Sequence, residues 1–301
     1  MKKLLITMLL LLLLLLSACS NTNPAKSTKS AVAEPTQSAV TPSPTIEKPE
    51  KLINPKGQTV QERITVPKGF ERINVENNSF GQYLRALPVK ADGTKIQLYN
   101  GEVTQKNVHA AILDIDVENR DLQQCADAVI RLRAEYLYSQ GLYKRIHFNF
   151  TNGFNADYWK WMNGNRIIVK GNKTYWIKNS NFSKEYSSFR KYLDVVFSYA
   201  GTLSLSKEMK IVSIENMQIG DVFVKGATPG HAVIVLDMAE NKKTGEKIFL
   251  TAQSYMPAQS IHILKNPENE AISPWYSTNF GDTLETPEWD FDKNQLMRFE
   301  N

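Results

Sequence analysis

Two side chains of this sequence, the thiol of Cys125 and the imidazole of His231, could together perform nucleophilic catalysis. A thiol nucleophile needs a route to its thiolate, a base that carries protons, and backbone donors for the oxyanion that forms on the substrate. His231 follows Gly230 and opens the apolar run "HAVIVLDM", so we expect its ring at the rim of a sheet. These residue types predict a thiol–imidazole pair, with the Cys125 N–H as one oxyanion donor.

Each of these residues also has a structural interpretation. Cys125 lies on the apolar face of its predicted helix, and free cysteine is among the most buried residue types. His231 taken alone is typical of a half-exposed histidine at a strand end. The sequence leaves both interpretations open.

Cys125 belongs to a predicted helix over residues 118–141. Its apolar side chains recur at spacings of three and four, as on one helix face: Leu122, Cys125, Val129, Leu132 and Tyr136. Asp121 followed three residues later by Gln124 predicts an N-cap at Asp121. Cys125 then lies at the edge of the region where the positive helix end lowers a thiol pKa, so a histidine would have to supply the remaining activation.

The other elements predict an α+β fold. We expect helices near 79–87 and over 184–201, and a strand over 109–117. Strands over 220–224, 231–238 and 247–253 follow with short turns, an order typical of an antiparallel sheet. With no internal repeat or second linker, residues 53–301 are predicted to form one domain. An aromatic cluster could stack on sugars or belong to the core: Tyr158, Trp159, Trp161, Tyr175 and Trp176.

The first residues indicate export. "MKK" and a leucine-rich run are typical of a secretory signal, and Leu16-Ser17-Ala18-Cys19 resembles a bacterial lipobox. That resemblance implies a signal peptide over 1–18 and a diacylglycerol on the Cys19 thiol; an ordinary signal peptide or an uncleaved anchor is the alternative. Residues 19–52 are rich in Ser, Thr and Pro and predict a disordered tether. Cys125 would then be the one free thiol of an exported protein.

Composition and motifs limit the kinds of ligand that we expect this protein to bind. The net charge of +5 is too small to indicate nucleic-acid binding. Neither a Gly-rich phosphate loop nor a Cys/His/Asp cluster at metal spacing occurs, so we predict no cofactor and no metal site.

The segment "IGDVFVKGATPGHAVIVLDM…KIFLTAQSYMP" resembles the histidine half of the NlpC-type and CHAP cysteine peptidases and amidases. The resemblance implies a papain-like core over about 119–265, in which a helix carrying the cysteine packs on an antiparallel sheet, with N-terminal additions. It implies Cys125 as nucleophile and His231 as base. CHAP domains carry a Glu and an Asn where this chain has Ala252 and Ser254, which leaves Gln253 or Ser254 to orient the histidine.

The chain from about Asn54 to its end also resembles a bacterial lipoprotein family known as domain of unknown function 4846. The resemblance rests on "RDLQQCADAVIRLRAEYLYSQG", "HFNFTNGFNADYWKWMNG", "GDVFVKGATPGHAVIVLDMAEN" and "AQSYMPAQSIHILKNP"; it implies no activity. We therefore expect a lipid-anchored, extracytoplasmic envelope protein that hydrolyses amide bonds in peptidoglycan or other envelope peptides. The alternative is a non-catalytic lipoprotein that binds wall fragments or a protein partner.

Overall fold

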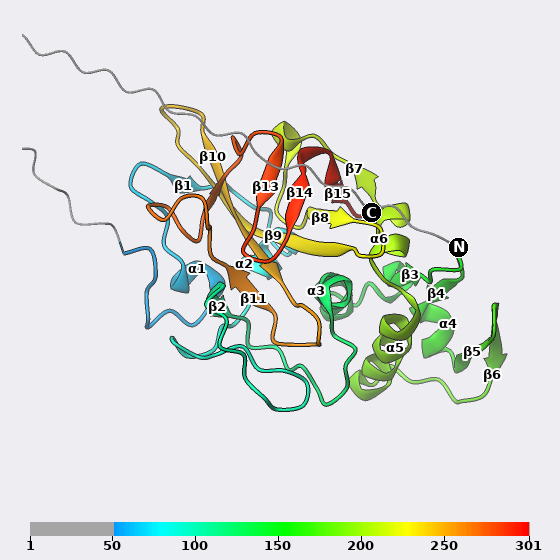
Figure 1. The fold of residues 1–301 in the computed structure, drawn as a ribbon. Coiled ribbons are helices and arrows are strands. Elements are labelled where there is room, and N and C mark those ends of the chain that lie inside the picture. The colour runs from blue at the N-terminus through cyan, green and yellow to red at the C-terminus, as the bar shows by residue number, and fades with distance from the viewer. Residues whose placement is uncertain (1–50, 301) are drawn as a thin grey trace, which may run out of the picture. The chain divides into compact units, whose positions relative to one another are not determined.

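A nine-stranded antiparallel sheet organises the computed structural model, which describes residues 51–300 (Figure 1). Its strands are β1 (Glu71–Arg72), β2 (His109–Ile112), β7 (Lys210–Ile211), β8 (Val222–Lys225), β9 (His231–Glu240), β10 (Lys247–Gln253), β11 (His262–Leu264), β12 (Tyr276–Ser277) and β15 (Leu296–Arg298). The order is β2-β11-β10-β9-β8-β15-β7, with β1 paired to β9 and β12 to β10. The predicted α+β class with an antiparallel sheet is confirmed.

The sheet separates two apolar clusters, and β9 contributes to both. Ala232 and Ile234 join the larger cluster together with apolar residues of α3 (Cys125–Ser139) from Ala126 onward. Val233 and Val235 join the smaller one with the hairpin β13 (Thr283–Glu285) and β14 (Asp290–Asp292). Because both faces are covered, β9 is apolar along most of its length rather than alternating.

Helix α3 begins four residues later than the N-cap predicted at Asp121, and that prediction is wrong. The N-cap is Gln124, whose backbone N–H donates to Asp127 Oδ2 at 3.1 Å. The Asp121 carboxylate instead accepts the backbone N–H of Ala258 at 2.7 Å. A tertiary contact thus occupies the predicted cap, and Cys125 becomes the first helical residue.

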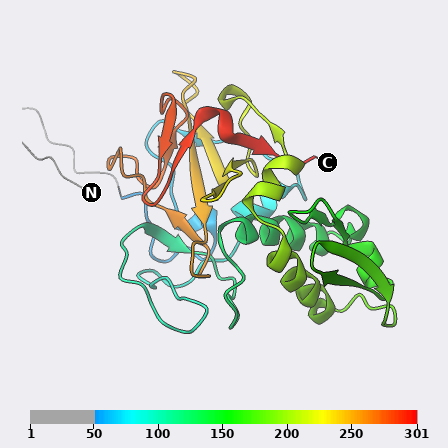
Figure 2. The same ribbon diagram turned by 45° about the vertical axis from the view of Figure 1, so that its right-hand side comes forward.

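The remaining elements lie around the sheet and beside it. Three short helices lie near the sheet: α1 (Val60–Arg63), α2 (Phe80–Arg85) and α6 (Thr202–Glu208). A separate group lies at the edge of the fold in Figure 2: β3 (His147–Asn149), β4 (Asn155–Asp157), α4 (Tyr158–Met162), β5 (Asn165–Lys170), β6 (Lys173–Lys178) and α5 (Tyr186–Tyr199). Of the aromatic cluster, Tyr158 and Trp161 are core residues, whereas Trp159 and Tyr175 are exposed.

Within residues 51–300, no helix combines the length and apolar character needed to cross a bilayer. The predicted signal peptide, the lipidated Cys19 and most of the predicted tether lie outside the described residues.

Candidate functional site

The thiol of Cys125 lies at the junction of α3 and β9. Backbone N–H groups of Ala126, Cys125 and Ala232 point at its sulfur. The first N–H groups of a helix have no partner inside the helix, so a first-turn side chain can receive them. Ala232 follows His231 on β9, and the sulfur therefore lies next to the backbone that carries the imidazole.

The Cys125 thiol is protonated at neutral pH. Burial is the main influence and raises its pKa to about 11. The N–H of Ala126 opposes this rise, and the negative charge of Asp127 adds to it. With 8% of its surface exposed, the residue gains less from the helix end than it loses by leaving water.

The imidazole of His231 projects toward the face of the sheet opposite α3. Its ring lies 5.0 Å from that of Tyr255, 5.4 Å from that of Trp289 and 6.0 Å from that of Phe291, measured between centroids. Burial lowers the His231 pKa, which a hydrogen bond to Gln253 partly offsets. The imidazole is therefore neutral at pH 7.

A hydrogen-bonded chain sets the tautomer of that imidazole. Gln253 Nε2 donates to Glu288 Oε2 at 2.7 Å, and Glu288 in turn pairs with Lys106. Because a carboxylate only accepts, the Gln253 amide must present its oxygen to His231, whose Nε2 lies 2.6 Å away. Nε2 then carries the proton, and Nδ1 keeps the basic lone pair.

His262 completes the buried network. It pairs with Gln253 in the β10–β11 register, its Nε2 lies 3.4 Å from Gln253 Nε2, and its Nδ1 lies 2.9 Å from the Ser260 carbonyl oxygen. Complete burial lowers its pKa to about 3. Sequence patterns singled out neither His262 nor Glu288; pairing "TAQS" with "SIHIL" as a hairpin would have placed His262 beside Gln253.

Ser254 has a different set of partners. Its hydroxyl lies 2.7 Å from the Gln123 carbonyl oxygen and 2.8 Å from that of Gln259. It therefore joins the segment before α3 to the end of β10. Of the two residues proposed to orient His231, the structure brings Gln253 to the imidazole.

The ring of Tyr255 contacts His231. Burial and the charge of Glu288 are the main causes that raise the Tyr255 pKa, with Cys125 also contributing. No hydrogen bond joins the sulfur directly to the imidazole among the residues described. The structure thus gathers Cys125, His231 and Gln253 at one end of the sheet, with the thiol and the imidazole approaching from opposite faces.

Residues 51–300 hold no group of three or more His, Cys, Asp or Glu side chains arranged to bind a metal ion.

Comparison with known proteins identifies the family to which this chain belongs. No curated protein and no solved structure matches this chain. The family described as "Domain of unknown function (4846)" matches residues 60–298. This match covers most of the chain, and the protein therefore belongs to that family.

Proposed function

We propose that this protein is a lipid-anchored envelope hydrolase, a peptidase or amidase of papain-like type that acts on peptidoglycan or other envelope peptides. The observation that carries the proposal is the 2.6 Å contact between His231 Nε2 and Gln253 Oε1. It directs the basic Nδ1 away from the amide, on a residue whose neighbour Ala232 donates to the Cys125 sulfur. A nucleophile, a base and a group that orients the base are the parts of a thiol triad.

The neutral resting pair determines the order of proton movements. His231 Nδ1 takes the thiol proton as the sulfur bonds to the substrate carbonyl carbon, which gives an oxyanion facing the N–H groups at the start of α3. The imidazolium then returns its proton to the leaving amine as the C–N bond breaks, and a thioester remains. Water attacks the thioester, loses its proton to His231, and releases the acid and the thiol.

A substrate must reach a thiol and an imidazole that are both buried beneath other side chains. The imidazole is 2% exposed, and the rings of Tyr255 and Trp289 lie against it. Tyr255 precedes Met256, a strongly exposed residue on the loop that follows β10. We place substrate entry at this loop, because the Tyr255 ring lies against the imidazole there.

The cellular part of the proposal rests on the N-terminal sequence. The basic start, the leucine-rich run and the Leu16–Cys19 motif support export and a lipid on Cys19. The resemblance of the Gly-Asp…Gly-His segment to the NlpC-type and CHAP enzymes supports a wall amide as the substrate.

A second function, a non-catalytic envelope protein that binds wall fragments or a protein partner, is favoured by one observation. The Cys125 thiol is buried and protonated and makes no direct hydrogen bond to His231. A structural cysteine has these properties.

Incubation of the full chain with purified peptidoglycan separates the two functions. We expect release of new amino groups, reduced at least about a hundredfold in Cys125→Ala and in His231→Ala, since a positioned base contributes on the order of 10²–10⁴ in rate. Lys191→Met, which changes an exposed side chain on α5, is the control. Cleavage that survives Cys125→Ala would exclude this mechanism. Sedimentation with peptidoglycan but no cleavage would establish the binding function instead.

A further inference from the structure

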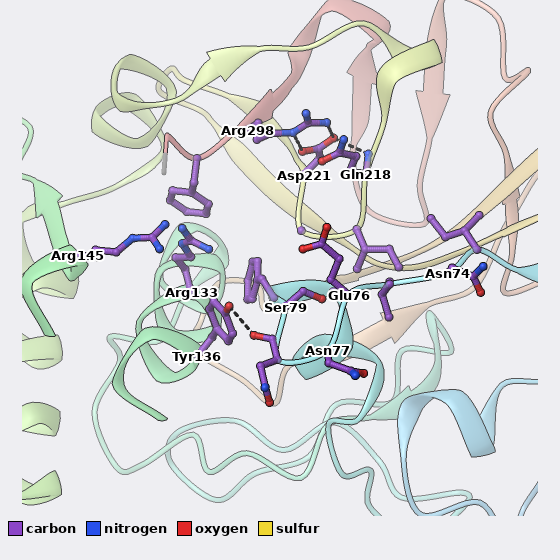
Figure 3. Close-up of a pocket in the computed structure, with 18 residues that line it drawn as sticks. Asn74, Glu76, Asn77, Ser79, Arg133, Tyr136, Arg145, Gln218, Asp221 and Arg298 are labelled. Atoms are coloured by element: carbon purple, nitrogen blue, oxygen red, sulfur yellow. Dashed lines mark hydrogen bonds and ion pairs between the residues drawn. The ribbon is translucent and has the colours of Figure 1, made fainter. Parts of the chain in front are cut away.

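One cavity lies away from the thiol, beside the middle of α3. Its volume is about 790 Å³, and it is lined by the 73–81 segment, by residues 218–221 before β8, and by the end of β15 (Figure 3). Helix α3 contributes Arg133 and Tyr136. Arg133 follows Cys125 by eight residues, about 12 Å along the helix axis, so this cavity is separate from the proposed catalytic site.

Arg133 is a buried cation that has no acidic partner among residues 51–300. The residue is 7% exposed, and it makes no hydrogen bond or ion pair with the described residues. Its guanidinium carbon lies 5.2 Å from the ring centre of Phe80, 5.7 Å from that of Tyr136 and 5.6 Å from that of Phe299. Ring faces attract a cation, but they accept none of its N–H groups as a carboxylate or phosphate does.

The surroundings of Arg133 make this charge costly. Burial, and then the charge of Arg145, lower its pKa to about 10. Figure 3 shows Arg133 and Arg145 pointing toward each other at one end of the cavity. The buried guanidinium of Arg133 provides a strong field for an anion.

Neither acidic residue that lines the cavity, Glu76 or Asp221, pairs with Arg133. Asp221 is held by Arg298, through contacts of 2.6 and 2.7 Å. Glu76 is exposed and lies on the wall near Ser79, apart from Arg133 (Figure 3). Its charge is screened by water.

We propose that this cavity binds a ligand through a carboxylate or phosphate group, which is held by the guanidinium of Arg133. A planar guanidinium presents paired N–H donors that match two oxygens of either group. Ile73, Val75 and Ile219 line the same cavity and provide an apolar wall for the body of the ligand. The recognised feature is an anionic head on a partly apolar molecule.

Calorimetric titration of the full chain tests this proposal, with inorganic phosphate, glycerol 3-phosphate and N-acetyl-alanyl-alanine as probes. We expect saturable binding of at least one probe, weakened at least about tenfold in Arg133→Met. Binding of phosphates alone or of the peptide carboxylate alone assigns the class of head group. Lys191→Met removes the same charge from the surface and should bind as the wild type does.

Thermal unfolding supplies a second measurement, which tests the proposal even if one of the variants does not fold. Without added anion, Arg133→Met should unfold at a higher temperature than wild type, because an unpaired buried charge has been removed. The probe that binds should then raise the melting temperature of the wild type and not that of the variant. Arg133→Lys should fold as the wild type does. It should bind the anionic probe more weakly, since lysine keeps the charge and loses the paired donors. No saturable binding to wild type, or equal weakening by Lys191→Met, would overturn the proposal.

Discussion

Alkylation of Cys125 by iodoacetamide should be slower in the folded protein than in the unfolded chain, despite its place at a helix start. Burial raises the thiol pKa from 9.0 to about 11. At pH 8 this leaves a thiolate fraction about a hundredfold smaller than in the unfolded chain. A more basic thiolate is more nucleophilic, which recovers about six- to tenfold for such a difference in pKa. The net expectation is a rate at least about tenfold lower, before any loss from restricted access.

The assay follows the Cys125-containing peptide by mass spectrometry after timed alkylation of the full chain, with and without guanidinium chloride. From about pH 6 to pH 10 the logarithm of the folded-state rate should rise by about one per pH unit, as for a thiol far below its pKa. His231→Ala should leave this profile unchanged, because a neutral imidazole provides no ion pair to hold the thiolate. A folded-state rate that is independent of pH between about 6 and 8 would refute the reasoning, since it would reveal a thiolate–imidazolium pair at rest.

Three further predictions concern buried charges. Asp237→Ala should lower the free energy of unfolding by about 3–5 kcal/mol, because this carboxylate is fully buried between two arginines; urea unfolding should show a far smaller loss for the exposed Asp282→Ala. A His262 pKa of about 3 provides stability that is complete above about pH 6.5 and is lost as the pH falls toward 3, about 2 kcal/mol of it between pH 7 and pH 5. His262→Gln should flatten that part of the curve, and an unchanged curve would show that the imidazole is not held neutral. Asp127→Asn should speed Cys125 alkylation increasingly as the pH rises through the Asp127 pKa, which burial holds well above its usual range, since the ionised carboxylate adds to the rise of the Cys125 pKa; an unchanged rate up to about pH 10 would mean that burial acts alone.

Periodicity predicted the parts of this fold whose burial is local to one element. The apolar face of α5 and the strands β9 and β10 were found from sequence, because side-chain alternation and helical spacing report burial directly. The start of α3 was misplaced, because Asp121 is a competent cap by type and a distant N–H, that of Ala258, determines its actual role. Single-sequence patterns contain no record of such a partner.

The candidate site likewise contains some residues that the sequence predicted and one that it did not. Cys125 and His231 were predicted from residue type, local context and the resemblance to the NlpC-type and CHAP enzymes, and that resemblance left Gln253 or Ser254 to orient the histidine. Glu288 was not predicted, because it reaches Gln253 from the segment between β13 and β14, where no periodic pattern indicates a strand. Its contribution depends on how the hairpin covers the sheet, which is a tertiary property.

The position of Glu288 beside Gln253 affects the chemistry of the proposed hydrolase. Lys106 neutralises Glu288, so the chain from Lys106 to His231 ends in a neutral amide oxygen rather than in a carboxylate. An amide orients the imidazole but stabilises its protonated form less than a carboxylate does. Together with a buried thiol, this favours a resting pair without charge, in which proton transfer waits for the substrate. A site built in this way resists alkylation and oxidation of its sulfur in the envelope compartment that we propose for it, because the thiolate forms only during attack.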